Sequence, residues 1–331
     1  MTVYDLPGIS LSVAATSPRI EKALKNIFKE CPLAQTPPDV ALKGSGVKHN
    51  DFVEHLPSWI VSRLPDLKPN MTPVILYGPS QQAAALGTCD DLIFCAWNSK
   101  HGNEINFICT VNDNEYAYGL FHPVLIPVLR EVYLQRGFFM LHSAGIRCPD
   151  GTGALIIAVS GGGKTTTTLS MIRQGAGLLS DDLIILKPSS DSTQAGGIPK
   201  ALNLHDETIS FYDELKRLPD SSFVQQHKEK KSVSPTRIYG KECLCSDTDI
   251  HVIYFVKISA AGPYVKPLPV AESLKRLALA HGFTYNQKLE AQSIKGLTLA
   301  LQHANAYELS TGPDPIKLGT WLLEHCTEHA Q

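Results

Sequence analysis

Hydrophobic residues recur along this chain with the two periods that distinguish helices from strands. Val124, Val128 and Val132 recur at four-residue steps, which predicts a helix over residues 123–136 with a broad apolar face. Pro18 follows Ser17 and opens a second predicted helix, residues 18–28. β-Branched and aromatic residues predict strands at residues 9–14, 74–77, 92–97 and 105–111.

The predicted elements fall into two parts. Short strands and helices before residue 120 indicate a small α/β domain over residues 1–120, in which no pattern indicates chemistry. The second part, residues 121–331, continues with predicted strands 138–147 and 154–159. A turn-type sequence at Cys148–Gly151 joins them, which predicts a hairpin or two adjacent strands. Later elements predicted in this part are a strand at residues 250–258 and helices at 270–280 and 290–304.

A glycine-rich loop follows the apolar strand 154–159 and precedes a helix-length stretch. Glycines allow the backbone to turn its N–H groups inward around phosphate oxygens, and a helix start adds its positive dipole end. In such a P-loop the lysine reaches the β- and γ-phosphates and the next hydroxyl binds Mg²⁺. The candidate phosphate-binding residues are Ser160, Gly161, Gly162, Gly163, Lys164, Thr165 and Thr166.

The P-loop pattern normally starts with another glycine, where this chain has Ala158. We expect this change to be tolerated, because the position ends the strand. A glycine-rich turn that binds nothing is the alternative. The strand before the loop, the helix after it and an acidic segment downstream favour the P-loop.

Two adjacent carboxylates, Asp181 and Asp182, interrupt the next apolar segment, residues 178–186. We predict a single strand here, in which adjacent side chains point to opposite faces. One carboxylate would then face Lys164 and the metal, and its neighbour would face the group that attacks the γ-phosphate. A solvated polar strand end is the alternative interpretation.

Composition narrows the class of protein. The chain has 331 residues, of which 43% are hydrophobic and 19% charged, with a net charge of −2. This balance is typical of a globular protein and gives no basic field for nucleic acid or an anionic membrane. Eight cysteines without a disulfide or zinc framework, and a start without a secretory signal pattern, favour a cytoplasmic protein.

Three segments resemble the catalytic domain of HPr kinase/phosphorylase and its relatives. They are residues 142–146 (His-Ser-Ala-Gly-Ile), the P-loop at 160–166, and residues 175–182 (Gly-Ala-Gly-Leu-Leu-Ser-Asp-Asp), in the family's order and near its spacing. The resemblance covers residues 141–186, continues loosely to the C-terminus and does not include residues 1–120. It implies an α/β fold with a mixed β-sheet, related to that of phosphoenolpyruvate carboxykinase. It also implies transfer of the γ-phosphoryl group of ATP, with Mg²⁺, to a serine hydroxyl of a protein or peptide.

The resemblance also assigns roles to residues. Lys164 and Thr165 match the P-loop lysine and the magnesium-binding hydroxyl. Asp182 matches the carboxylate that accepts the hydroxyl proton, and Asp181 matches the acidic residue nearer the metal. His142 matches a histidine close to the phosphates, although a histidine in a strand is commonly structural. The catalytic candidates are therefore Asp182, Lys164 and His142, and the metal-binding candidates are Thr165 and Asp181.

The chain departs from the family in two places. Residues 196–205 lack the acidic residue of the bifunctional members, and residues 265–269 match their arginine-containing segment poorly, so we expect little phosphorylase activity. Asp206 or Glu207 could supply a further magnesium ligand or simply begin a helix. Lys230 or Lys231 could close over the phosphates or belong to a solvated lysine run.

Two other functions stay open, a kinase of a small hydroxyl compound and an ATP-binding regulatory module without catalysis. The family also suggests a homo-oligomer.

Overall fold

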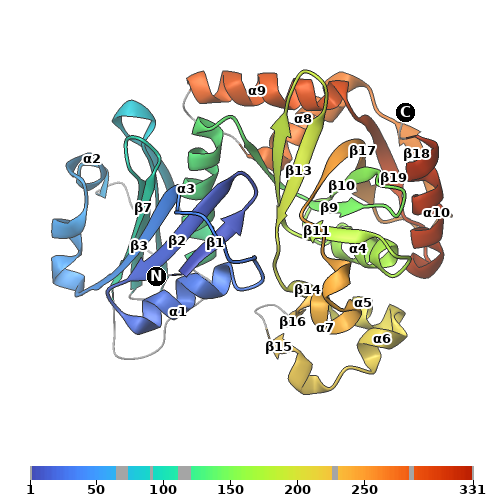
Figure 1. The fold of residues 1–331 in the computed structure, drawn as a ribbon, viewed down its shortest axis with the longest axis horizontal. Helices are drawn as coiled ribbons and strands as arrows, with labels where there is room; N and C mark the ends of the chain where they lie inside the picture. Colours follow the sequence, from blue (N-terminus) through green and yellow to red (C-terminus); the bar gives the residue numbers. More distant parts are fainter. Residues whose placement is uncertain are drawn as a thin grey trace. The chain divides into compact units, whose positions relative to one another are not determined.

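The computed structural model describes residues 2–64, 74–89, 92–110, 121–225, 230–282 and 287–329. The chain forms two compact units, Met1–Phe138 with Thr284–Glu290, and Phe139–Phe283 with Ala291–Gln331. Both are mixed α/β, as the sequence predicts (Figure 1). The division falls after helix α3 (Phe121–Gln135), so this helix is grouped with the first unit, whereas the sequence-based division places it with the second.

The first unit contains a seven-stranded sheet in the order β1-β2-β3-β7-β6-β5-β4. Helix α1 packs against β2 and β3, and α3 packs against β5 and β6. Its described elements are β1 (Thr2–Leu6), β2 (Ile9–Ala15), α1 (Pro18–Ile27), β3 (Val40–Val47), η1 (His49–His55), α2 (Ser58–Val61), β4 (Val74–Tyr77), η3 (Pro79–Gln81), β5 (Ala83–Cys89), β6 (Leu92–Asn98), β7 (Glu104–Thr110) and α3.

Strand β3 shows why part of this sheet escapes prediction from sequence. Its Gly44-Ser45-Gly46 sequence is typical of a turn. In the structure all three residues pair with β7, and Gly44 also pairs with β2. A Cβ atom added at Gly44 would lie 2.6 Å from Leu24 Cδ1 of α1. The glycine therefore allows the helix to approach the strand, rather than ending it.

The second unit contains a nine-stranded sheet with the path β11-β9-β10-β17-β13-β12-β8. Two further strands lie off this path: β19 pairs with β17, and β18 pairs with β19. Strand β10 runs parallel to β17, and β17 runs parallel to β19. A separate three-stranded sheet has the order β14-β16-β15. The strands are β8 (Phe139–His142), β9 (Ala144–Arg147), β10 (Gly153–Ile157), β11 (Gly177–Ser180), β12 (Leu183–Pro188), β13 (Thr193–Ile198), β14 (Leu202–His205), β15 (Val224–Gln225), β16 (Lys230–Val233), β17 (Asp247–Lys257), β18 (Tyr264–Pro267) and β19 (Asn305–Ser310).

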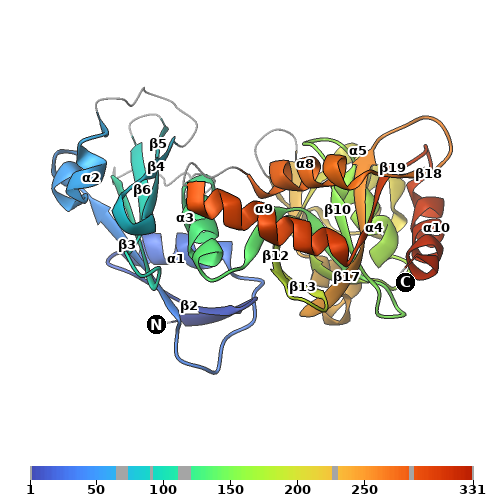
Figure 2. The same ribbon diagram turned by 90° about the horizontal axis from the view of Figure 1, so that it is seen from above.

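Helices cover this sheet, as Figure 2 shows from above. Helix α4 packs against β9, β10 and α10, and α8 packs against β8. The predicted helices at 270–280 and 290–304 correspond to α8 and α9 and are confirmed. The described helices of this unit are α4 (Lys164–Ile172), α5 (Asp206–Phe211), α6 (Asp213–Lys216), η5 (Asp220–Ser222), α7 (Pro235–Tyr239), η6 (Lys241–Cys243), α8 (Val270–His281), most of α9 (Gln287–Gln302) and α10 (Pro315–Glu328).

Helix α4 is positioned by its packing rather than by its own sequence. Its run of threonines has low helix propensity, because β-branched side chains lose rotamer freedom in a helix. Instead, α10 approaches it so closely that a Cβ atom added at Gly319 would lie 2.0 Å from the Ser170 carbonyl oxygen. Buried Met171 and Leu322 join the two helices to the core beneath β10 and β17. The start of α4 is thereby fixed at the end of β10. Among the helices of the described residues, none has the length and apolar character needed to cross a membrane.

Candidate functional site

The predicted P-loop lies between the end of β10 and the start of α4. Gly161 and Gly163 have φ angles of 76° and 92°, a left-handed conformation that favours glycine. A Cβ atom added at Gly162 would lie 2.9 Å from the Val159 carbonyl oxygen, which accepts the Gly162 N–H at 2.8 Å. The three consecutive glycines thus serve the tight curl that a phosphate cradle needs. Ala158, at the position of the missing glycine, is partly buried against the core.

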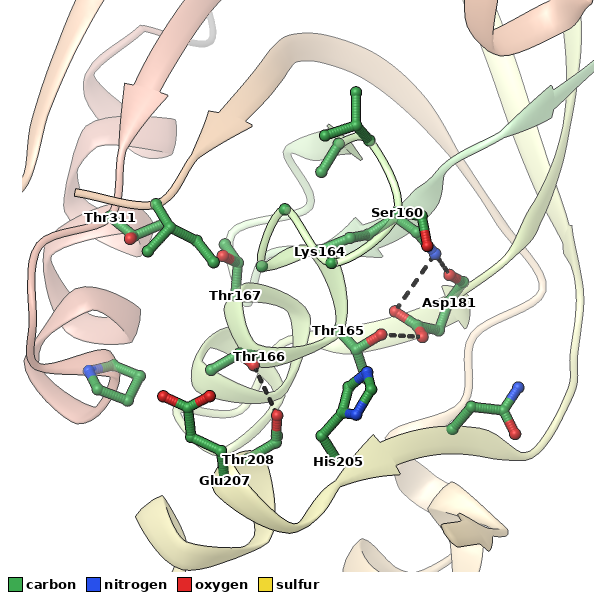
Figure 3. Close-up of a pocket in the computed structure, with 18 of the residues that line it drawn as sticks. Ser160, Lys164, Thr165, Thr166, Thr167, Asp181, His205, Glu207, Thr208 and Thr311 are labelled. Atoms are coloured by element: carbon green, nitrogen blue, oxygen red, sulfur yellow. Dashed lines mark hydrogen bonds and ion pairs between the residues drawn. The ribbon is translucent and has the colours of Figure 1, made fainter. Parts of the chain in front are cut away.

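Lys164, Thr165 and Asp181 form one connected group, seen in Figure 3. The Lys164 ammonium donates to the Asp181 backbone carbonyl and lies 3.9 Å from Asp181 Oδ1. The Thr165 hydroxyl donates to Asp181 Oδ2 at 2.7 Å. The next hydroxyl, that of Thr166, instead pairs with Thr208 Oγ1 at 3.0 Å. The structure therefore brings together the residues predicted to contact phosphates and metal.

The Asp181 carboxylate is buried, with 7% of its surface exposed. Burial raises the pKa of this carboxyl above its usual value, and the Lys164 ammonium and the Thr165 hydroxyl act in the opposite direction. Its Oδ1 atom accepts no hydrogen bond from the described residues. A buried carboxylate oxygen without a hydrogen-bond partner is costly, so it fits a position completed by a cation or ligand.

A hydroxyl beside one buried carboxylate fits Mg²⁺ that is shared with a nucleotide. Magnesium is usually held by one or two carboxylates, with phosphates and waters completing its shell. Among the described residues no group of three or more His, Cys, Asp or Glu side chains could hold a metal by themselves. The donors present thus suit a metal that arrives with triphosphate oxygens rather than a site built from protein ligands alone.

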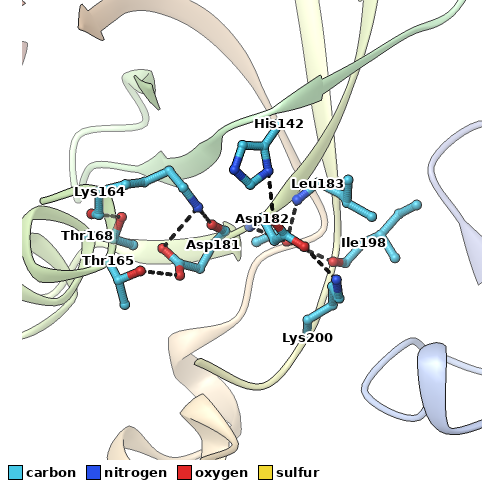
Figure 4. Close-up of polar contacts among 10 residues, drawn as sticks. His142, Lys164, Thr165, Thr168, Asp181, Asp182, Leu183, Ile198 and Lys200 are labelled. Carbon is cyan, nitrogen blue, oxygen red and sulfur yellow. Dashed lines mark hydrogen bonds and ion pairs between the residues drawn. The ribbon is translucent and has the colours of Figure 1, made fainter. Parts of the chain in front are cut away.

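The acidic segment is not the single strand that we predicted. The chain leaves β11 at Ser180, bends at the two aspartates and enters β12 at Leu183. Ser180 is fully buried and fixes this bend: its hydroxyl donates to the Ile198 carbonyl at 2.7 Å and accepts the N–H groups of Asp182 and Leu183, both at 3.3 Å. Asp181 and Asp182 point in different directions, as predicted (Figure 4). The cause is the bend between β11 and β12, not the alternation of side chains along a single strand.

Asp182 lies between two side chains that can carry positive charge. His142 Nδ1 lies 2.8 Å from its Oδ1, and Lys200 Nζ lies 2.5 Å from its Oδ2. The Asp182 side chain is 27% exposed and lines the same cavity as the P-loop. His142, which the resemblance predicts as a site residue, is therefore in direct contact with Asp182. In the sheet, His142 of β8 pairs with Leu183 of β12, the residue that follows Asp182.

Lys200 is a site residue that the sequence reasoning missed. Two residues after β13 it reaches Asp182, because β13 lies close to β11. A Cβ atom added at Gly197 would lie 2.1 Å from the Leu179 carbonyl oxygen, so only glycine fits this approach. Gly196-Gly197 followed by Pro199 was the available signal.

The cavity has a volume of about 530 Å³, within the range of ligand pockets. Its lining includes apolar residues, among them Val159, Ile258 and Pro313, with Val159 82% exposed and Ile258 59% exposed. It also includes His142, Asp182 and polar residues from the β14–β16 sheet. The predicted P-loop contributes to the wall of the same cavity.

The other residues considered from sequence separate into two groups. Glu207 and Lys230 line the cavity. Asp206 and Lys231 do not; they form an ion pair with each other, with 2.8 Å between Lys231 Nζ and Asp206 Oδ1. Residues 226–229, which directly precede Lys230 in the lysine run, lie outside the described residues.

No family model matches the chain, and no curated protein matches it. Among solved structures, the chain is similar to the HPr(Ser) kinase/phosphatase from Coxiella burnetii, with a TM-score of 0.32 and 11% sequence identity. The similarity covers 57% of this chain and 97% of that one. This is a weak structural likeness to a kinase/phosphatase.

Proposed function

We propose that this protein is an Mg²⁺-dependent kinase that transfers the γ-phosphoryl group of ATP to a serine hydroxyl of a protein or peptide. One observation carries the proposal: the P-loop and two differently directed carboxylates line a single cavity. Asp181 is directed to the Lys164–Thr165 side and Asp182 to the His142–Lys200 side. A nucleotide-binding module without catalysis would need the first group and not the second.

In this proposal the P-loop backbone and Lys164 hold the triphosphate. Lys164 already lies where it can exchange the Asp181 carbonyl for β- and γ-phosphate oxygens. Thr165 and Asp181 would hold Mg²⁺, which when bound neutralises charge on the triphosphate. The exposed apolar side chains of Val159 and Ile258 offer a surface for the nucleoside end.

Asp182 would orient the serine hydroxyl. The serine oxygen forms a bond to the γ-phosphorus, the bond from that phosphorus to the β–γ bridging oxygen breaks, and ADP leaves. The hydroxyl proton passes to the Asp182 carboxylate. The Asp182 carboxylate contacts His142 and Lys200, and a loose phosphoryl-transfer transition state needs chiefly alignment of the attacking oxygen.

The test is transfer of label from [γ-³²P]ATP into an array of short serine peptides, with and without Mg²⁺. Acid-stable label on serine that depends on Mg²⁺ and is lost in Asp182→Asn supports the proposal. ATP binding without label on any peptide contradicts it. Thr236→Ala, a change in α7 outside the cavity lining, provides a control for handling and folding.

A further inference from the structure

A small polar surface borders the cavity beyond Asp182. It is formed by β14 and β16, which pair in antiparallel register with Asn203 opposite Ser232 and His205 opposite Lys230. Side chains two residues apart on a strand share a face, and directly opposite partners lie on the same face. Accordingly Asn203, His205 and Lys230 all line the cavity, while Lys231 does not.

The groups on this face are arranged to donate hydrogen bonds. The Ser232 hydroxyl donates to Asn203 Oδ1 at 2.6 Å, which occupies the amide oxygen and leaves the amide NH₂ as the available group. Lys230 forms no ion pair with another described residue, in contrast to neighbouring Lys231, which is paired with Asp206. Lys200 precedes β14 and lies against Asp182.

Negative charge within the cavity is largely matched by other groups. Asp181 faces Lys164, and Asp182 faces Lys200 and His142. Glu207 also lines the cavity, but it lies beside Thr208 near the Thr166 end of the wall, as Figure 3 shows. The β14–β16 face is thus a donor surface next to the proposed acceptor position.

We propose that the β14–β16 face is a subsite for acidic residues that flank the accepting serine of a peptide or protein. This inference rests on the proposed function and specifies its substrate class. A peptide is the occupant because Asn203 and His205 line the cavity and are also exposed, so that a chain longer than the pocket can contact them from solvent. Carboxylates on either side of the serine would meet the Lys230 ammonium and the Asn203 amide, both of which donate charge-assisted hydrogen bonds to carboxylate oxygens.

The experiment measures binding separately from transfer. Three fluorescent serine peptides of equal length, flanked by Asp/Glu, by neutral residues or by Lys, are titrated by anisotropy with full-length protein saturated with Mg²⁺ and a non-hydrolysable ATP analogue. We expect the acidic peptide to bind about threefold to tenfold more tightly than the neutral one. This difference in affinity should become smaller as salt is added. Lys230→Met and Asn203→Leu should each reduce this preference. Lys231→Met is the matched control, since it removes an adjacent lysine of the same strand that does not line the cavity.

Several results would overturn the subsite. The first two are equal binding of the three peptides and equal effects of the Lys230→Met and Lys231→Met changes on peptide binding. The third is a Lys230→Met change that weakens nucleotide binding alone, which would place this lysine over the triphosphate. Displacement of the acidic peptide by free glutamate at the same concentration would assign the face to a small anion instead.

Label transfer measured in parallel separates this inference from the proposed function. Acid-selective binding without label transfer removes the kinase assignment and leaves the subsite. Equal labelling of all three peptides removes the subsite and leaves the kinase.

Discussion

Replacing Asp182 by asparagine separates catalysis from nucleotide binding. The amide keeps the size of the side chain and one acceptor for His142 or Lys200, but it cannot take a proton. Loss of a general base lowers turnover by roughly 10²–10⁴-fold, which raises the activation free energy by about 3–5 kcal/mol. The Lys164 ammonium contacts Asp181 rather than Asp182, so ATP affinity should change by no more than about twofold.

The assay combines label transfer from [γ-³²P]ATP into the serine-peptide array with calorimetric titration of a non-hydrolysable ATP analogue. Asp181→Asn is the paired control, because it removes the buried carboxylate beside Thr165. It should raise the Mg²⁺ concentration for half-maximal turnover by about tenfold or more, and excess Mg²⁺ should restore part of the activity. The reasoning is refuted if Asp182→Asn retains full turnover, or if it weakens nucleotide binding as strongly as it lowers transfer.

Four further outcomes follow from the same geometry. Lys164→Ala should weaken ATP binding about 10- to 100-fold by loss of a charge-assisted contact, and unchanged calorimetric affinity would remove the P-loop assignment. Burial raises the pKa of Asp181, so protons should compete with Mg²⁺ for this carboxylate as pH falls toward that raised value. Mg²⁺ titrations should therefore show weaker binding at lower pH. A pH-independent Mg²⁺ affinity would exclude Asp181 as a ligand. Ser180→Ala should cost about 1–3 kcal/mol in urea unfolding, since three hydrogen bonds meet at its buried hydroxyl, and a neutral change would show that the bend is held by other contacts. Phosphorylated product incubated with excess inorganic phosphate should release little pyrophosphate, and rapid release would show that the missing acidic segment is dispensable.

Local patterns in the sequence were sufficient for the glycine-rich turn of the candidate site. The strand–loop–helix order and the Gly-Gly-Gly-Lys-Thr sequence predict the turn, and β10, Gly163 and α4 lie as this pattern requires. The helix with its four-residue apolar steps is confirmed as α3, ending before Gly137 with a φ angle of 78°. These features depend on contacts between near neighbours in the chain, which one sequence can reveal.

Features that depend on contacts between distant segments were missed. The bend between Asp181 and Asp182 depends on Ser180 meeting the carbonyl of Ile198, eighteen residues later. A stretch of apolar residues around two aspartates looks the same whether it forms one strand or two. Lys200 reaches Asp182 only because Gly197 allows two strands to touch. Glycine in a strand indicates a close approach, but the sequence does not say to what.

Transfer of the γ-phosphoryl group to serine tests the account most directly. Wild-type protein and Asp182→Asn are incubated with [γ-³²P]ATP, Mg²⁺ and the serine-peptide array at matched nucleotide occupancy. The account predicts Mg²⁺-dependent phosphoserine with the wild type, and a loss of roughly 10²–10⁴-fold in the variant. Nucleotide bound by the wild type without any phosphoserine, or equal labelling by both proteins, would contradict it.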